Sequence, residues 1–181
     1  WDVVIDTCGY VPRIVRRSAE VLAPNVGRYV FISSISVYRE PLAPGAAEDA
    51  PLAVLADEAV EDVTGETYGA LKALCEGAVQ QVFGERALVI RPGLIVGPHD
   101  PTNRFTYWVT RIAEGGDVLA PDDRSAPVQL IDVRDLAEWT LHLAAEGVGG
   151  VFNATGPAQP LTLEGTLSAC RRATGSQARM V

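Results

Sequence analysis

The chain has 181 residues, of which 48% are hydrophobic, and a formal net charge of −8, as expected of a globular domain with a real core. The acidic balance argues against nucleic-acid binding, and no apolar run approaches the ~20 residues of a membrane span, so we expect neither partner. The cysteines lack metal-ligand spacing, which predicts no metal site and reduced thiols in a cytoplasmic protein; they are Cys8, Cys75 and Cys170.

Short apolar runs alternate with longer amphipathic segments, a pattern typical of an α/β fold with a parallel sheet covered on both faces. The expected strands are, in chain order, Val3–Asp6, Tyr29–Ser33, Arg86–Arg91, Val118–Leu119, Val128–Ile131 and Val151–Asn153. The expected helices are Pro12–Leu22, Glu66–Phe83, Phe105–Glu114, one capped by Asp132 or Asp135 and ending near Ala145, and one capped by Thr162 and ending near Ala173. Two loops interrupt this pattern, a long acidic one at 39–65 and a Gly/Pro-rich one at 92–103.

One position stands out within the helix expected at Glu66–Phe83. Lys72 is the only lysine of the chain, all other basic residues among the 15 being arginine, and it follows Tyr68 by four positions. At that spacing the two side chains share a helix face, and a nearby ammonium favours the phenolate of a tyrosine. Tyr68 is therefore a candidate proton donor or acceptor, although an exposed pair without any chemistry has the same spacing.

Hydroxyl groups gather after the strand expected at Tyr29–Ser33. Ser33, Ser34 and Ser36 follow its apolar core, and in open parallel sheets ligands bind just outside the carboxyl ends of the strands. Ser34 could thus hold the substrate oxygen that Tyr68 protonates. Alternatively, these serines only satisfy backbone groups in a turn.

With these residues the chain resembles the extended branch of the short-chain dehydrogenase/reductase superfamily, the NAD-dependent epimerases, dehydratases and reductases. The resemblance covers nearly the whole chain and rests on five runs in the same order: Asp2–Asp6, Phe31–Tyr38, Tyr68–Lys72, Arg91–Pro98 and Gln129–Ala137. It implies a Rossmann-like, doubly wound parallel sheet with a small C-terminal substrate-binding region. Residues 1–98 would form the C-terminal half of the dinucleotide-binding domain, and 99–181 mostly the substrate-binding region, with segments returning to the sheet.

One part of the family pattern is missing. The Gly-rich phosphate-binding turn does not occur, and Val3–Asp6 resembles the family's fourth strand. We therefore expect the chain to be an internal piece of a longer protein, whose N-terminal part would carry the pyrophosphate site and select NAD or NADP.

The resemblance also implies roles for individual residues. Ser34, Tyr68 and Lys72 would be catalytic, with Lys72 lowering the pKa of the tyrosine and binding the nicotinamide ribose of NAD or NADP. Further contacts to the cofactor would come from Thr7, Cys8, Gly9, Ser33, Pro92, Gly93 and Leu94. Arg104 and Trp108 could line the substrate pocket, although a core or helix-surface role explains the aromatic Trp108 at least as well.

The implied reaction is hydride transfer at a secondary alcohol or ketone carbon of a small molecule, such as a nucleotide sugar or another hydroxy or keto compound. Ile35 and Ser36 stand where the family's dehydratases carry Asp-Glu, and Ser36 where some epimerases carry Cys, which leaves reduction or epimerisation by oxidation and re-reduction. The alternative is a non-catalytic nucleotide-binding or regulatory protein that keeps the fold. The helix at Glu66–Phe83 is apolar around much of its circumference, so we expect a homodimer of the full-length protein through it.

Overall fold

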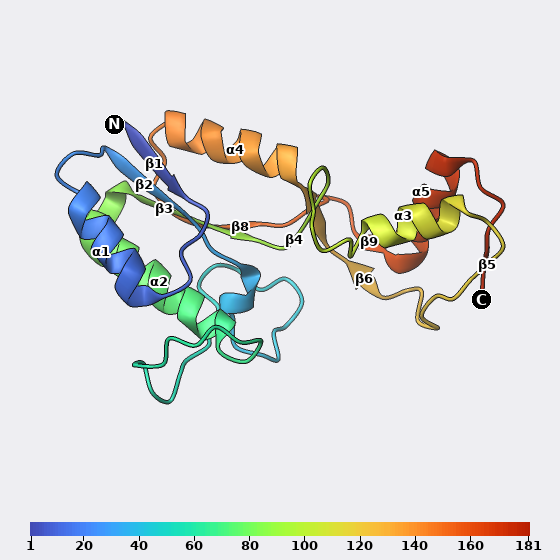
Figure 1. Ribbon diagram of the computed structural model, residues 1–181, viewed down its shortest axis with the longest axis horizontal. Helices are drawn as coiled ribbons and strands as arrows, with labels where there is room; N and C mark the ends of the chain where they lie inside the picture. Colours follow the sequence, from blue (N-terminus) through green and yellow to red (C-terminus); the bar gives the residue numbers. More distant parts are fainter. The chain divides into compact units, whose positions relative to one another are not determined.

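The computed structural model describes residues 1–181, which fold as two compact units (Figure 1). Unit 1 consists of Trp1–Gly93 and Leu136–Ala154, and unit 2 of Leu94–Asp135 and Thr155–Val181. The first division falls between Gly93 and Leu94, whereas the family resemblance implied a boundary after Pro98. None of the helices is both long and apolar enough to cross a membrane.

Unit 1 is built on a parallel sheet. Its four strands lie in the order β1 (Val3–Asp6), β2 (Arg28–Ile32), β3 (Ala87–Pro92) and β8 (Gly150–Ala154). Every pair is parallel, with Ile5 opposite Val30 and Val30 opposite Leu88. The carboxyl ends of the strands therefore meet at one edge of the sheet, which is where open α/β sheets bind ligands. The predicted α/β class with a central parallel sheet is confirmed.

Helices cover both faces of this sheet. Helices α1 (Pro12–Leu22) and α2 (Tyr68–Phe83) lie on one face, and α4 (Val133–Ala145) lies on the other (Figure 1). Strands of such a sheet are buried on both faces, and all six residues of β3 are indeed buried. On α4, the ring of Trp139 packs edge-on against Phe152 of β8, with centroids 6.2 Å apart.

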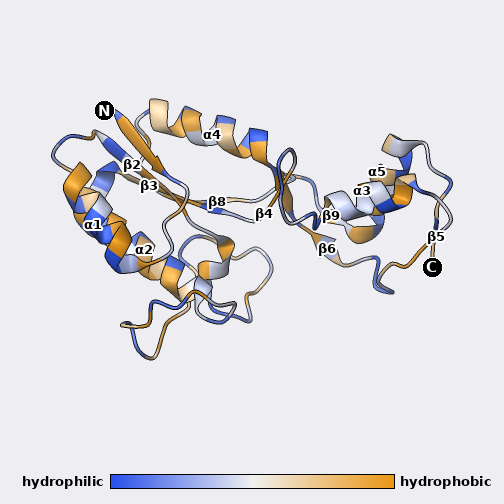
Figure 2. Ribbon diagram, in the orientation of Figure 1, coloured by the Kyte–Doolittle hydropathy of each residue, from blue (hydrophilic) through white to orange (hydrophobic).

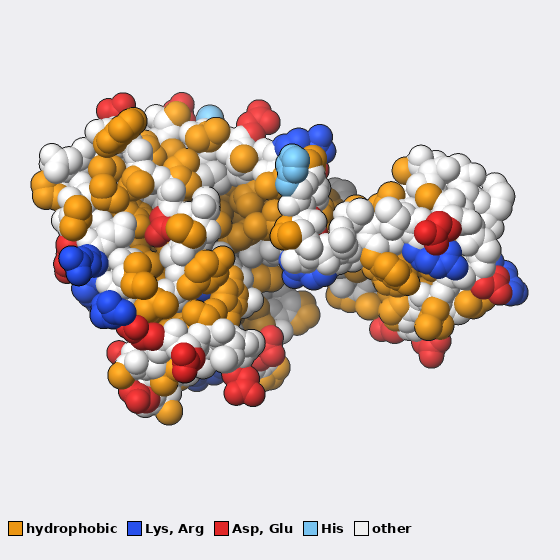
Figure 3. Space-filling model, in the orientation of Figure 1, with side chains coloured by type: hydrophobic (Ala, Val, Ile, Leu, Met, Phe, Trp, Pro, Cys, Tyr) orange, Lys and Arg blue, Asp and Glu red, His pale blue; other side chains and the backbone are white.

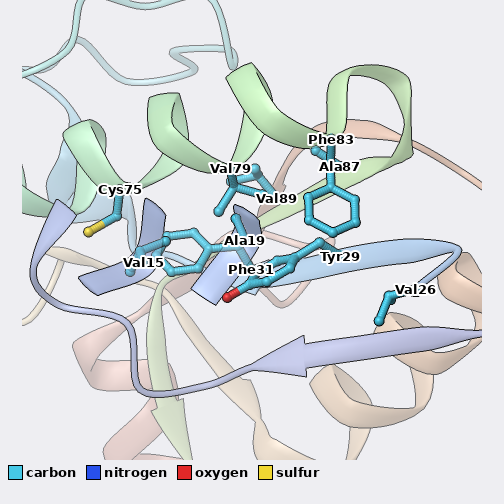
Figure 4. Close-up of a cluster of buried hydrophobic side chains, with 10 residues drawn as sticks. All are labelled: Val15, Ala19, Val26, Tyr29, Phe31, Cys75, Val79, Phe83, Ala87 and Val89. Carbon is cyan, nitrogen blue, oxygen red and sulfur yellow. The ribbon is translucent and has the colours of Figure 1, made fainter. Parts of the chain in front are cut away.

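The core between the sheet and the helices α1 and α2 is aromatic and aliphatic. Figure 4 shows its members, which are Val15, Ala19, Val26, Tyr29, Phe31, Cys75, Val79, Phe83, Ala87 and Val89. Tyr29 and Phe31 are two positions apart on β2 and so point to the same face of the sheet. The outward side of α1 carries both polar and apolar residues (Figure 2), and basic side chains gather over it with acidic ones beside them (Figure 3). One such pair is Arg13 with Glu61, 2.8 Å apart.

Unit 2 contains two helices and three short strand pairs. Helices α3 (Thr106–Ala113) and α5 (Leu163–Thr174) enclose a small core with Ile112, Val118 and Leu167 at its centre. The strand pairs are β4 (Leu94–Val96) with β7 (Leu130–Asp132), β5 (Asp117–Val118) with β10 (Arg179–Met180), and β6 (Pro127–Val128) with β9 (Leu161–Thr162). As predicted, Thr162 caps α5, its hydroxyl accepting the backbone N–H of Gly165 at 3.1 Å.

Two expectations about unit 2 were wrong. The loop expected at 92–103 contains strand β4, because Leu94–Val96 pairs with β7 far along the chain. The single strand expected at Val128–Ile131 is two strands, β6 and β7, which pair with different partners. At the start of α4, the carboxylate of Asp132 accepts the backbone N–H of Arg134 at 2.8 Å, which favours Asp132 over Asp135 as the capping residue.

Candidate active site

The helix that carries the candidate proton donor begins at that residue. Tyr68 is the first residue of α2, and its backbone N–H donates to the carbonyl of Thr64 at 2.9 Å. The hydroxyl of Thr67 accepts the backbone N–H of Thr64 at 2.9 Å and donates to the carbonyl of Asp62. These threonine contacts hold the backbone in a turn, so the helix begins at Tyr68 instead of Glu66.

The surroundings of the Tyr68 phenol set its acidity. Burial raises the pKa of Tyr68 above its ordinary value, and a hydrogen bond with Ser34 acts in the opposite direction. The Tyr10 ring lies beside it, with the two centroids 6.3 Å apart. The Lys72 ammonium, which the sequence places on the same helix, donates to the main-chain carbonyls of Gly9 and Ile32.

Lys72 binds the ends of two strands. Its side chain is almost wholly buried, and Nζ donates to the carbonyl of Gly9 at 2.8 Å and to that of Ile32 at 2.7 Å. The ammonium also lies 4.1 Å from the centroid of the Phe31 ring. Burial lowers the pKa of Lys72, and the electrostatic influence of Cys75, foremost among its neighbours, opposes that lowering. Since Gly9 follows β1 and Ile32 ends β2, this ammonium marks the carboxyl edge of the sheet.

The serines lie in a tight turn directly after β2. Ser34 caps the short helix at Ile35–Val37, and its Oγ accepts the backbone N–H of Ser36 at 3.1 Å and donates to the Ser36 hydroxyl at 3.1 Å. Ser33 is 4% exposed, and its backbone N–H donates to the carbonyl of Ile90 at 2.6 Å. The Oγ of Ser33 is buried without a hydrogen-bond partner, which is unusual for a buried hydroxyl.

The contact between this turn and α2 depends on a glycine. A Cβ on Gly69 would lie 2.1 Å from the carbonyl oxygen of Ser36, far closer than atoms can approach. The absent side chain lets the first turn of α2 lie directly against the serine turn. Because Tyr68 directly precedes Gly69, this close approach also brings the Tyr68 phenol next to Ser34. A phenol and a hydroxyl beside a buried ammonium are suited to moving a proton to or from one substrate oxygen.

The residues expected to contact a cofactor fall at the same edge of unit 1. After β1, the backbone N–H of Cys8 donates to the Asp6 carboxylate at 2.9 Å, while Thr7 and Cys8 are exposed. Gly9 is buried, and a Cβ there would lie 2.6 Å from the Phe31 ring. The backbone at Gly9 therefore packs directly against Phe31, which a larger residue would prevent.

The segment after β3 crosses the division between the units. Pro92 is buried as the last residue of β3, and the backbone N–H of Gly93 donates to the carbonyl of Ala154 on β8 at 3.1 Å. Leu94 begins β4 in unit 2. Pro92 and Gly93 thus end at the same sheet edge as the serine turn.

The two residues expected at the substrate belong to unit 2. Arg104 is exposed, and its Nε donates to the hydroxyl of Thr102 at 2.9 Å. Trp108 packs against the core between α3 and α5, with the edge of its ring against Tyr107. Within its unit, Trp108 therefore has the core role that the sequence left open.

Sequence reasoning missed a buried charge pair. Glu76 of α2 and Arg91 of β3 are 2% and 3% exposed, and the Arg91 Nη2 lies 2.7 Å from the carboxylate. Glu76 follows Lys72 by four residues in a helix that is otherwise mostly apolar, and Arg91 is the next-to-last residue of the apolar strand β3. An acidic residue on a buried helix face and a basic residue on a buried strand were signals for such a pair, because buried charges are almost always paired.

Comparisons with solved structures agree with this architecture. The dTDP-4-dehydrorhamnose reductase of Clostridium acetobutylicum superimposes with a TM-score of 0.75 at 15% identity, covering 99% of this chain and 64% of that one. The UDP-glucuronic acid 4-epimerase of Bacillus cereus, in complex with NAD, gives 0.69 at 17% identity, covering 93% and 53%. The protein RMD of Pseudomonas aeruginosa, complexed with NADPH, gives 0.68 at 22% identity, covering 99% and 69%.

The first two of these structures show that the chain spans less than two thirds of such proteins. No protein of curated function matches it in sequence. A family model, described as the NAD dependent epimerase/dehydratase family, matches residues 9–155, which include the serine turn, α2 and the whole of β3 and β8. The resemblance seen in the sequence is confirmed: the chain belongs to the NAD dependent epimerase/dehydratase family.

Proposed function

We propose that the full-length protein is an NAD(P)-dependent oxidoreductase or epimerase in which Tyr68 is the acid/base group. The observation that carries this proposal is the meeting of Tyr68, Ser34 and Lys72 at the carboxyl edge of β1 and β2. Membership of a family whose description names NAD supports it. Unit 1 would hold part of the cofactor site, and unit 2 would contribute to substrate binding.

The residues at this edge fit a dinucleotide. The Oγ of Ser33 is buried without a partner, and Lys72 uses two of its three ammonium donors on carbonyls. Both groups can therefore donate to the hydroxyl or amide groups of a ligand that enters the edge. Thr7, Cys8 and the backbone at Gly9 would border its ribose, and Pro92 and Gly93 its ring. A bound nicotinamide would supply the hydride acceptor or donor.

The chain's own residues would handle the proton. Tyr68 would take the proton of a substrate hydroxyl during oxidation and return it during reduction, while Ser34 donates a hydrogen bond to the same oxygen. Burial raises the pKa of the Tyr68 phenol, so forming the phenolate would require a positive charge beside it. Lys72 would supply this charge, because its ammonium is held at the same end of the sheet by the carbonyls of Gly9 and Ile32.

Nucleotide sugars are the favoured substrate class. The solved structures include a reductase and an epimerase whose names state dTDP- and UDP-linked sugars. Ile35 and Ser36 supply no carboxylate beside Ser34, so reduction or epimerisation is favoured over dehydration. A non-catalytic nucleotide-binding protein is the alternative, and it would bind the dinucleotide without turning over any of these sugars.

We also propose that the full-length protein is a homodimer that pairs through α1 and α2. Within one chain α2 is more fully covered than its sequence suggested, because α1 and the serine turn pack against it, and Ala78 is only 1% exposed. The free apolar surface lies on α1 instead, where Ile14 and Val21 are 56% and 66% exposed. These two residues are two turns apart and form one stripe.

The decisive experiment replaces one phenol at a time in the full-length protein. Tyr68→Phe should lower turnover of UDP-glucuronic acid, UDP-N-acetylglucosamine or dTDP-4-dehydrorhamnose by about 10²–10⁴-fold, with NAD and NADPH binding nearly unchanged. The matched control is Tyr10→Phe, because the Tyr10 ring neighbours Tyr68 but is itself 46% exposed. Wild-type turnover in Tyr68→Phe would remove this assignment. Dinucleotide binding without turnover of any sugar would support the non-catalytic alternative.

A further inference from the structure

A single buried guanidinium connects several parts of unit 1. Arg91 donates from Nε to the two Glu76 carboxylate oxygens at 3.0 and 3.3 Å and from Nη2 to one of them at 2.7 Å. Its Nη1 donates to the Tyr38 hydroxyl at 2.8 Å and to the main-chain carbonyl of Glu48 at 2.9 Å. Arg91 is 3% exposed, and each of its three guanidinium nitrogens donates to a protein group.

The partners of Arg91 are also bonded to one another. The Tyr38 hydroxyl donates to the side-chain oxygen of Asn153 at 2.6 Å, and the backbone N–H of Asn153 donates to the Glu48 carboxylate at 2.7 Å. This last bond holds the pKa of Glu48 below its usual range. The contacts form a closed ring that runs from Arg91 through Tyr38, Asn153 and Glu48 back to Arg91.

The ring is attached to the segments that carry both proposed catalytic hydroxyls. Tyr38 directly follows the short helix capped by Ser34, and Glu48 lies in the acidic loop at 39–65 that joins this turn to α2. Glu76 follows Tyr68 by eight residues, which places it on the same helix face two turns away. The guanidinium therefore holds the helix of Tyr68, the turn of Ser34 and the loop between them.

Stability alone is a weak reason for such an arrangement. A buried ion pair is often no more stabilising than apolar residues of the same volume, because both charges lose their hydration. Its distinguishing property is geometry, since the planar fork of arginine fixes its partners in direction as well as in distance.

On the basis of the function proposed above, we propose that Arg91 is a positioning residue for the reaction, which sets Tyr68 against Ser34 without touching the substrate. The bonds of Arg91 to Tyr38 and Glu48 fix the serine turn and the acidic loop relative to the guanidinium. Its bonds to the Glu76 carboxylate fix α2 in the same way.

The test uses two buried tyrosines of the full-length protein. Tyr38→Phe removes one oxygen, which breaks the link between Arg91 and Asn153 and leaves the Arg91–Glu76 pair in place. The matched control is Tyr29→Phe, because Tyr29 is 1% exposed and donates its hydroxyl to Asp6 at 2.8 Å, away from Arg91. We expect Tyr38→Phe to lower kcat by about tenfold or more with KM within about twofold, since small displacements of reacting groups have large effects on rate. Tyr29→Phe should keep kcat near the wild-type value, even if it lowers the thermal stability as much as Tyr38→Phe does.

Hydrogen exchange decides the same question without a substrate. Tyr38→Phe should speed the exchange of backbone amides in the serine turn at 34–38, in the loop at 46–53 and in the first turns of α2, whereas Tyr29→Phe should leave these three segments unchanged. Arg91→Lys, which keeps the charge but loses the fork, should give the same pattern in a folded protein. Wild-type exchange at all three segments in both Tyr38→Phe and Arg91→Lys overturns the proposal. If the protein turns over no nucleotide sugar, the proposed function is refuted. The exchange experiment would still show whether Arg91 positions the serine turn, the loop and α2.

Discussion

Gly69→Ala tests how closely the helix of Tyr68 must approach the turn of Ser34. The added methyl group would lie 2.1 Å from the carbonyl oxygen of Ser36, whereas ordinary contacts begin at 3.4 Å. The turn and the helix must therefore separate by about 1 Å, a displacement that can reduce turnover by about 10²-fold. Overpacking of this kind destabilises by about 1–3 kcal/mol, and the better helix propensity of alanine offsets up to about 1 kcal/mol of that.

A second glycine of the same helix provides the control. A Cβ on Gly77 would meet nothing within 4 Å, so Gly77→Ala should stabilise the protein by about 0.5–1 kcal/mol through the unfolded chain and leave turnover unchanged. Urea unfolding and steady-state turnover of the full-length variants measure both effects. The reasoning fails if Gly69→Ala is as active as Gly77→Ala, because the close approach would then have no role in placing Tyr68 and Ser34.

Lys72→Arg should lower kcat/KM by at least about tenfold and destabilise by about 1–3 kcal/mol in urea unfolding, because a guanidinium does not fit the buried place of an ammonium; wild-type values would contradict the role given to the lysine. The bond from Asn153 depresses the pKa of Glu48, so its stabilisation is present above pH ~4.5 and is lost as the pH falls below it. Thermal midpoints of the wild type and Glu48→Gln should therefore converge in acid, and a constant difference down to pH ~3 would refute this. Sedimentation of the full-length protein should show a dimer that Ile14→Glu dissociates, whereas a wild-type monomer at micromolar concentration would exclude the dimer.

Local sequence signals predicted most of unit 1. The strand Val3–Asp6 and the helix Pro12–Leu22 have the bounds that their apolar patterns indicated. The Tyr68 and Lys72 side chains do lie on one helix at one sheet edge, because a spacing of four fixes their relation within α2. These features depend on periodicities that a few consecutive residues reveal.

The remaining features depend on contacts between residues far apart in the sequence. Strand β4 has only three residues and exists through its pairing with β7, so its Gly/Pro-rich surroundings indicated a loop. The partners of Lys72 are main-chain carbonyls, which any residue type can offer and which no pattern reveals. The acidic loop is attached to unit 1 through Glu48, and this attachment depends on Arg91 and Asn153, both distant in the sequence.

The two carbonyl contacts of Lys72 bear on how such a protein changes in evolution. The ammonium joins the end of β1 to the end of β2, so a replacement that ended catalysis would also leave buried carbonyl groups without partners. A lineage that abandoned the reaction would still be selected to keep this lysine for the sake of the sheet. Tyr68, whose phenol makes no comparable contact with the backbone, could then be replaced by other residues. From the role proposed for Tyr68, we expect the tyrosine to be the better marker of retained activity among relatives of this chain, and a lysine without it to mark a protein that keeps only the fold.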